Sequence, residues 1–318
     1  MKISAHGGCR TNWKGNMKRT LIAFGLLAVV AVQAAERWVP DYLRKISVTI
    51  RAEAGYSKSE GSGTLFVRNV KDGNKTVRKV FVWTAGHVIS DLRREESTLV
   101  NGKPSKKVVF DNPKILRELR NKDGRRTGEV VVDTKVLRYS PANKHDLALL
   151  MVMSEDFEAK ESVEFIPKGA PLIRVGARLW HCGSMLGTGR NGEGSGHNSI
   201  TDGVMSAHGR LLFKEPFCQT TANAMPGSSG GIIADERGRY VAMLVRGAGE
   251  TFNLGVPVAR MHRWSEANGI AWAMDAKKPV TLKEIEKLPI EGVAESGDQS
   301  GELKNYPFLI RKEKREQK

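Results

Sequence analysis

Cysteine is scarce in this sequence, with only Cys9, Cys182 and Cys218 among 318 residues. Cys9 precedes the apolar run that we interpret as a targeting segment, so the exported chain holds one pair. Cys182 and Cys218 can form a disulfide in an oxidising compartment or remain two buried thiols, and the sequence leaves both options open. Metal-ligand spacing is also lacking. We therefore expect neither a metal nor another cofactor.

Acidic residues are few beside the basic ones: 35 Asp and Glu stand against 51 Lys and Arg, a formal net charge of +16. Many basic residues fall between positions 106 and 126, where acidic residues are interspersed and no patch with interleaved aromatic residues occurs. Surfaces that bind single-stranded nucleic acid commonly combine positive charge with aromatic side chains. We interpret this region as a solvated face. The expected partners are protein or peptide substrates, with no specific nucleic acid.

Long apolar runs are lacking too. Leu21–Val32 extends over 12 residues, short of the about 20 needed to span a membrane. Basic residues precede this run and small residues follow it, as in a secretory signal peptide cleaved after Ala34 or Ala35. We predict a signal peptide at residues 17–34 and export to the periplasm or the medium, with an uncleaved signal anchor as the alternative. Residues 1–16 fit no signal peptide and are interpreted as an extension or a start-site artefact.

The rest of the chain contains short Val-, Ile- and Leu-rich runs separated by Gly, Asn, Asp and Pro, which is typical of β-strands. Three of its segments each contain one residue of a possible catalytic unit: Thr84–Val88 with His87, Asp146–Leu150 with Asp146, and Pro226–Gly231 with Ser229. A serine hydroxyl becomes a nucleophile when an imidazole removes its proton. A carboxylate fixes the tautomer of that imidazole and stabilises its charged form. The order His, Asp, Ser therefore predicts a serine peptidase.

Each of the three positions has a competing interpretation. His87 can be an ordinary buried histidine at a strand end, although the joint occurrence of the motifs favours a catalytic one. Asp133 also lies on a strand approach, but only Asp146 stands immediately before an apolar run. Ser228 is a hydroxyl as well, but the Gly-x-Ser-Gly-Gly register puts the nucleophile at Ser229.

These motifs resemble the chymotrypsin/trypsin-like serine peptidases, and the bacterial HtrA/Deg-like branch most of all, from about Val48 to Met261. Strand-like segments extend the likeness beyond the three motifs: Gly61–Val67, Val80–Trp83, Val130–Leu137, Asn198–Arg210, Gln219–Ala222 and Leu254–Pro257. The resemblance implies an all-β fold of two antiparallel six-stranded β-barrels, at 40–160 and 161–270, with a short C-terminal helix near Val258–Asn268. A C-terminal extension and basic tail, 271–318, would follow, too short for the PDZ domains of HtrA proteins.

The glycines around Ser229 allow a tight turn in which the amides of Gly227 and Ser229 form an oxyanion hole. By resemblance, the substrate pocket has its base near Asn223, and its walls are Val245, Arg246, Gly247 and Gly255. No aspartate lies at this base, which argues against a preference for Lys or Arg and favours an uncharged, medium-to-large residue. Arg246 is expected to favour acidic side chains in neighbouring subsites.

One departure from the family pattern concerns activation. In the trypsin branch an aspartate precedes the nucleophile and receives a newly cut N-terminus. Ser228 occupies that position here, so we expect no activation by N-terminal insertion.

Two other classes of function remain as alternatives to an exported serine endopeptidase. The first is a chaperone or binding module that keeps a protease fold with little or no turnover. The second is an esterase or acyltransferase that uses the same nucleophile.

Overall fold

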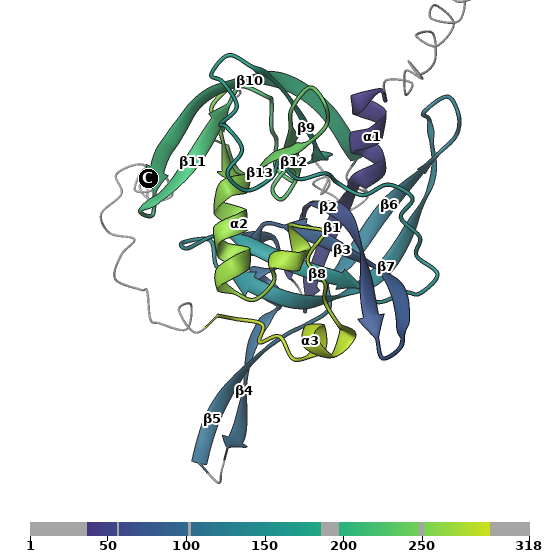
Figure 1. The fold of residues 1–318 in the computed structure, drawn as a ribbon, viewed down its shortest axis with the longest axis vertical. Coiled ribbons are helices and arrows are strands. Elements are labelled where there is room, and N and C mark those ends of the chain that lie inside the picture. The colour runs from purple at the N-terminus through teal and green to yellow at the C-terminus, as the bar shows by residue number, and fades with distance from the viewer. Residues whose placement is uncertain (1–36, 56, 101–102, 186–196, 248–250, 293–318) are drawn as a thin grey trace, which may run out of the picture. The chain divides into compact units, whose positions relative to one another are not determined.

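A computed structural model describes residues 37–55, 57–100, 103–185, 197–247 and 251–292. The centre of the fold consists of two closed antiparallel barrels of six strands each (Figure 1). The first has the strand order β1-β2-β3-β8-β7-β6, with bounds Ser47–Ala54, Ser57–Asp72, Lys75–Thr84, Leu147–Val152, Arg126–Ser140 and Lys114–Arg120. The second has the order β10-β11-β14-β13-β12-β9, with bounds His197–Leu212, Glu215–Thr220, Asn253–Pro257, Tyr240–Gly247, Ile232–Ala234 and Arg178–Met185.

The second half of β3 and the whole of β8 line the core of the first barrel because these stretches are nearly continuous apolar runs. The last five residues of β3 are buried, from Val80 to Thr84. In the core the ring of Phe66 stacks on Phe81, with 5.3 Å between centroids, and on Trp83 at 6.4 Å. Burying such a side chain stabilises a fold by about 1.5–3 kcal/mol. The two strands are antiparallel with Thr84 opposite Ala148, so the end of β3 meets the start of β8.

The second barrel contains both cysteines of the predicted exported chain. Cys182 lies on β9 opposite Ile232, and Cys218 lies on β11 opposite Gly255. Both side chains are buried and both thiols are free, so of the two options left open by the sequence the structure has the buried thiols. Burial raises the pKa of each thiol to about 12.

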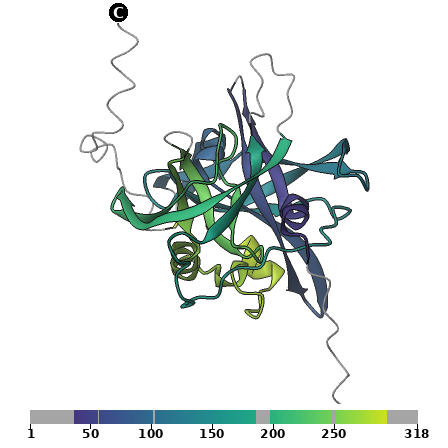
Figure 2. The same cartoon turned by 90° about the horizontal axis from the view of Figure 1, so that it is seen from above.

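The N-terminal helix α1 (Val39–Ile46) joins the two barrels. Pro40 stands in its first turn, where a missing N–H costs no hydrogen bond. Tyr42, Leu43 and Ile46 are buried, and the helix contacts β9 and β10 of the second barrel before the chain enters β1 of the first (Figure 2).

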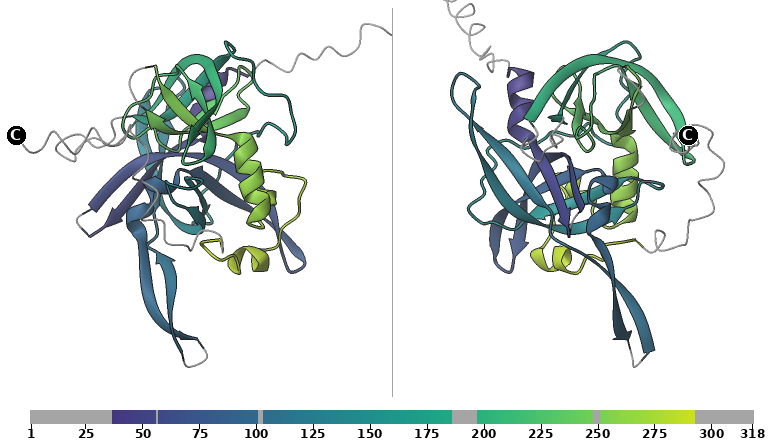
Figure 3. Two further views of the ribbon diagram at one scale, coloured as in Figure 1. Left: turned by 90° about the vertical axis from the view of Figure 1, so that its left-hand side faces the viewer. Right: turned by 180° about the vertical axis from the view of Figure 1, so that it is seen from behind.

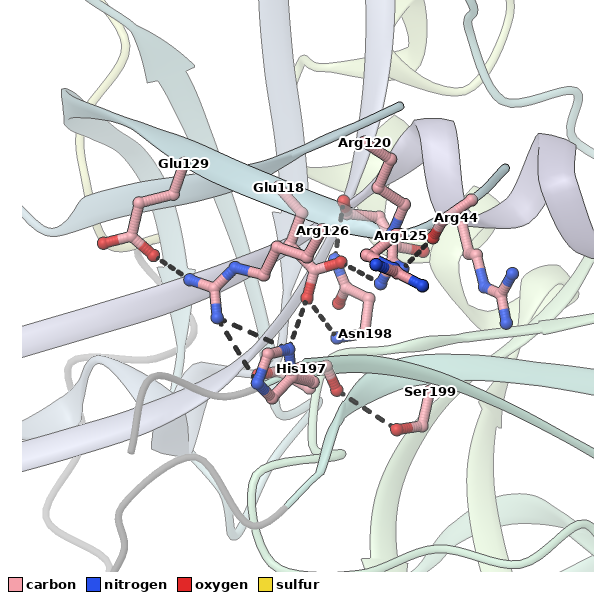
Figure 4. Close-up of polar contacts among 12 residues, drawn as sticks. Arg44, Glu118, Arg120, Arg125, Arg126, Glu129, His197, Asn198 and Ser199 are labelled. Atoms are coloured by element: carbon pink, nitrogen blue, oxygen red, sulfur yellow. Dashed lines mark hydrogen bonds and ion pairs between the residues drawn. The ribbon is translucent and has the colours of Figure 1, made fainter. Parts of the chain in front are cut away.

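A polar cluster also connects the barrels, between β6 and β10 (Figure 4). We call it the Glu118 cluster: Glu118, Arg120, His197 and Asn198. The Glu118 side chain is only 7% exposed, and its carboxylate pairs with the guanidinium of Arg120. It also accepts a hydrogen bond from the backbone N–H of Asn198 at 2.9 Å and lies 3.4 Å from His197 Nδ1.

Strands β4 (Arg93–Val100) and β5 (Lys103–Phe110) form a separate two-stranded sheet that projects from the first barrel (Figure 3). The sequence predicts only a solvated charged face in this region. None of the described side chains in this hairpin is fully buried, so it lacks the apolar face by which a strand is recognised. Its base is fixed by Arg93, whose Nε lies 2.6 Å from Glu291 Oε1.

The C-terminal part of the described chain returns to the first barrel after helix α2 (Val258–Ala267), which stands where the sequence predicts a helix. The 3₁₀ turn η3 (Ala271–Ala273) and helix α3 (Leu282–Glu286) follow. The buried guanidinium of Arg68 donates to the carbonyl oxygens of Trp272 and Ala273 at 2.7 and 2.9 Å. The first half of the predicted extension is therefore packed on the barrel.

The predicted all-β fold with two six-stranded barrels and a short C-terminal helix is confirmed. Barrel strands β1 to β8 lie within residues 40–160, and β9 to β14 lie within 161–270. In the part of the chain that is described, no helix is long and apolar enough to cross a membrane. The predicted extension or artefact at 1–16, the signal peptide at 17–34 and the basic tail from 293 onward lie outside the described residues.

Candidate active site

His87 and Asp146 are brought together by the pairing of β3 with β8. His87 lies in the 3₁₀ turn η1 (Gly86–Val88) just after β3, and Asp146 immediately precedes β8. Gly86 allows this approach, because a Cβ atom there would lie 2.1 Å from the carbonyl oxygen of Ser140. The register of two antiparallel strands thus places an imidazole beside a carboxylate from a segment 59 positions away.

The contact between the two side chains is close and largely hidden from solvent. His87 Nδ1 lies 3.0 Å from both carboxylate oxygens of Asp146, and the backbone N–H of His87 donates to Oδ1 at 2.9 Å. The Asp146 side chain is 1% exposed and that of His87 is 28% exposed. Burial works to raise the pKa of Asp146, but the hydrogen bonds from His87 and the charge of Arg246 hold it below its usual range. The carboxylate is therefore ionised.

This arrangement fixes the tautomer of His87. An ionised carboxylate only accepts hydrogen bonds, so Nδ1 carries a hydrogen when the ring is neutral. Nε2 of the neutral ring is then the acceptor, which is the form that a general base requires.

Ser229 lies in the loop between β11 and β12, and this loop packs on the end of β3. Gly230 has a φ of 88°, and a Cβ atom there would lie 2.1 Å from the carbonyl oxygen of Ser62 and 2.5 Å from Thr84 Oγ1. Glycine is required at this position because of the positive φ and because any side chain would collide with Ser62 and Thr84. Thr84 is only three residues before His87, so the loop with Ser229 lies directly against the segment that leads to the imidazole.

Ser62 on β2 fastens this loop to the first barrel, a role that the sequence analysis missed. Its N–H donates to the carbonyl oxygen of Ser229 at 2.7 Å, and its hydroxyl donates to that of Gly227 at 2.7 Å. The same hydroxyl accepts from the backbone N–H of Ser184 at 2.7 Å. The only signal in the sequence is a serine between two glycines, in the strand-like segment Gly61–Val67.

The competing residues occupy different environments. Ser228 is buried, and its Oγ accepts a hydrogen bond from the backbone N–H of Met225 at 2.9 Å, which closes the turn before Ser229. Asp133 is exposed on β7. Of the two candidate carboxylates, the structure brings Asp146 and not Asp133 to His87.

A cavity of about 450 Å³ opens beside Ser229. Its lining includes three of the predicted substrate-binding residues, Asn223, Arg246 and Gly247. Two others are not in the lining: Val245 is 2% exposed, and Gly255 is packed against the side chains of its neighbours. The remaining lining residues are Ala224, Met225, Pro226, Ser228, Ser229 and Leu244, so none of the described residues that border the cavity is acidic.

Arg246 has a contact that the sequence did not predict. Its Nη2 lies 3.4 Å from Asp146 Oδ2 and donates to the carbonyl oxygen of Ala142 at 3.2 Å. From the sequence, this arginine is predicted to face substrate side chains. Its guanidinium pairs with the carboxylate that holds His87.

No metal site is evident among the described residues. Within the described ranges, no group of three or more His, Cys, Asp or Glu side chains is arranged so that it could hold a metal ion.

The sequence matches a known protein family. Residues 61–243, more than half of the chain, match the family described as trypsin-like peptidase domain. No curated protein matches the sequence.

Solved structures with a similar fold include a serine endoprotease from Yersinia pestis, with 16% identity and a TM-score of 0.48 over 73% of this chain and 65% of that one. Deg5 has 20% identity and a TM-score of 0.47 over 71% of this chain and 89% of Deg5. The HtrA-type protease AlgWS227A with tripeptide has 18% identity and a TM-score of 0.47 over 73% of this chain and 62% of that one. The chain thus spans less than two thirds of the length of the first and third of these.

Proposed function

Because the chain belongs to the trypsin-like peptidase domain family, we propose that it is a serine endopeptidase with His87, Asp146 and Ser229 as its catalytic triad. The observation that most strongly supports this proposal is the pair of 3.0 Å contacts between His87 Nδ1 and the buried Asp146 carboxylate. Such a pair orients an imidazole for proton transfer. Ser229 borders the adjacent cavity, where a peptide would meet it.

In the proposed mechanism, Nε2 of His87 takes the hydroxyl proton of Ser229 as its oxygen attacks the carbonyl carbon of the peptide bond. Asp146 stabilises the imidazolium that forms, and the amides of Gly227 and Ser229 hold the oxyanion. His87 then gives the proton to the leaving amine, and the C–N bond breaks to leave an ester on Ser229. Water, deprotonated by His87, hydrolyses the ester and frees the serine.

The cavity supports a substrate class as well. Because none of the described residues that border it is acidic, a lysine or arginine side chain of the substrate would find no carboxylate partner among them. We propose an uncharged, medium-to-large residue on the acyl side of the cleaved bond. Cleavage of a peptide library mainly after Lys or Arg would contradict this assignment.

We also propose that the protein is exported, and the support is the run at Leu21–Val32 preceded by basic residues. Expressed in a bacterial host, the protein should be recovered outside the cytoplasm with an N-terminus at Ala35 or Glu36. Recovery with Met1 or Met17 intact in the cytoplasm would contradict export.

The proposed activity is tested by intact mass after treatment of the purified protein with a fluorophosphonate. We expect one adduct on the wild type, none on Ser229→Ala and almost none on His87→Ala, because an unactivated serine does not react. Ser199→Ala, a serine outside the candidate site whose hydroxyl bonds the carbonyl oxygen of His197, is the control and should retain the adduct. A folded wild type without an adduct would contradict the proposal and favour a binding module.

A further inference from the structure

The Asp146 carboxylate has one partner that a serine peptidase mechanism does not account for. His87 contacts both of its oxygens, and the backbone N–H of His87 donates to Oδ1. Arg246 Nη2 lies 3.4 Å from Oδ2. A carboxylate that is 1% exposed requires several donors to remain ionised, because water does not reach it.

The position of Arg246 on β13 explains how it reaches this carboxylate. The side chain of the preceding residue, Val245, is buried and apolar, so it cannot donate a hydrogen bond to the Asp146 carboxylate. Arg246 extends across to the first barrel instead, and its Nη2 also donates to the carbonyl oxygen of Ala142 at 3.2 Å. Two fixed acceptors, Asp146 and Ala142, therefore hold the guanidinium at the junction of the two barrels.

Other charged groups surround the pair, but they are differently placed. Arg260 on α2 is 1% exposed and donates to the backbone carbonyl oxygen of His145 at 2.7 Å. Its ion pair is with Glu215 on β11, which also faces His145 and Arg263. The charge of Arg260 acts on Asp146 as well, without an ion-pair contact. Burial lowers the pKa of His145, so it adds no positive charge at neutral pH. Among the described residues, His87 and Arg246 are the two whose side chains form ion pairs with Asp146.

We propose, on the premise that His87, Asp146 and Ser229 form the catalytic triad, that Arg246 is a positioning residue for that triad. It holds the carboxylate in place and shares its negative charge. The sharing weakens the attraction that Asp146 exerts on a proton at His87.

This role differs from the one that the sequence suggests for Arg246. A subsite arginine binds acidic side chains of the substrate, and its removal raises KM for acidic peptides alone. A positioning arginine acts on every substrate through Asp146, and its removal lowers kcat with little change in KM.

The first experiment measures the titration of the His87 ring by NMR in the inactive Ser229→Ala protein, so its result does not depend on turnover. Adding Arg246→Gln should move the midpoint up by about 0.5 pH unit or more, since a positive charge next to Asp146 is lost. Arg246→Lys keeps the charge and should recover most of that shift. The matched control is Arg239→Gln: Arg239 has the same 31% exposure, and it pairs with Asp235 at the other end of β13. It should leave the midpoint unchanged.

The second experiment measures kcat and KM against pH with an uncharged peptide and with a matched peptide that contains glutamate. Arg246→Gln should lower kcat about tenfold for both peptides, because a displaced catalytic group loses rate. It should also move the acid limb of kcat/KM to higher pH. An unchanged midpoint and acid limb, with KM raised for the glutamate peptide alone, would overturn the proposal. A wild type that cleaves neither peptide would refute the proposed function, and the titration would still decide whether Arg246 acts on His87.

Discussion

The Asp146 site and the Glu118 cluster contain the same chemical groups in two regions of the molecule. In each, a carboxylate that is at most 7% exposed contacts a histidine Nδ1 and an arginine guanidinium. They differ in the histidine: His87 is 28% exposed and lies 3.0 Å from both oxygens of Asp146, whereas His197 is 59% exposed and 3.4 Å from one oxygen of Glu118.

The surroundings differ as well. The turn with His87 follows the end of β3, on which the loop containing Ser229 and its cavity is packed. The Glu118 cluster connects β6 to β10, where Glu118 accepts from the backbone of Asn198. A carboxylate and a histidine therefore do not define an active site. The ring must be held in one orientation, and a nucleophile must lie beside it.

The largest expected difference between the two regions is the loss of a histidine. His87→Ala should lower kcat by about 10⁶-fold, as expected when the general base is removed. His197→Ala should leave kcat within about twofold, because its ring is exposed and far less constrained. Steady-state hydrolysis of a peptide checks both variants. Comparable losses of kcat in His87→Ala and His197→Ala would contradict the proposed difference between the Asp146 site and the Glu118 cluster.

The carboxylates come next. Asp146→Asn should lower kcat by about 10⁴-fold at neutral pH, because the amide favours the wrong tautomer of His87. Glu118→Gln should keep kcat but lower the free energy of unfolding by about 1–3 kcal/mol, since it weakens buried hydrogen bonds to Arg120 and Asn198. Denaturant unfolding and peptide hydrolysis separate the two effects. A catalytic loss in Glu118→Gln with unchanged stability would contradict this division.

A smaller effect is expected at Ser62, which links the barrels at the nucleophile loop. Ser62→Ala removes the bond to the Gly227 carbonyl oxygen and leaves the N–H of Ser184 without its acceptor. We expect a loss of about 1–3 kcal/mol in unfolding free energy and about tenfold in kcat. Ser199→Ala, near the Glu118 cluster, is the control and should change neither. An unaffected kcat in Ser62→Ala would mean that the loop holds its geometry without this serine.

A third histidine, His181, extends the comparison to a buried ring that has no carboxylate partner among the described residues. His181 is fully buried, its Nδ1 bonds the carbonyl oxygen of Ile232, and its Nε2 has no partner among the described residues. Burial lowers the pKa of His181 to about 4. Between this value and about 6.5 the unfolded chain binds a proton that the folded chain does not, so stability falls as pH decreases from 6.5 to 4.

The loss over that window should be about 3 kcal/mol. Denaturant unfolding at several pH values should show a flatter profile for His181→Gln than for the wild type, and an unchanged profile for His197→Ala. Equal slopes of unfolding free energy against pH in the wild type and in His181→Gln would contradict the lowered pKa of His181.

The last prediction concerns the rate at which the buried thiols react with a labelling reagent. With pKa values near 12, Cys182 and Cys218 contain almost no thiolate at pH 8, and the folded protein should react with a thiol reagent far more slowly than the unfolded one. Rapid labelling of the native protein would contradict this prediction.

Much of the fold was predictable because its strands are apolar where they are buried. Val80–Trp83 and Leu147–Leu150 could be recognised as core strands, and short motifs at their ends marked His87 and Asp146. The β4–β5 hairpin could not be recognised in this way, because none of its described side chains is buried. Nor could the return of the C-terminal segment to Arg68, which depends on hydrogen bonds to backbone carbonyl groups.

The sequence by itself determined the abundance of β-strands and the order of the candidate triad, because apolar periodicity, turn residues and short motifs are local properties of a chain. The two barrels followed from the resemblance of these motifs to a known family. The sequence already favoured Asp146 over Asp133, and the structure brings Asp146 to His87. Only the tertiary structure decided that Ser62 fastens the loop of Ser229 and that Arg246 pairs with Asp146. These contacts join residues far apart in the chain. Their distances are set by strand register and barrel packing, which no single segment of sequence specifies.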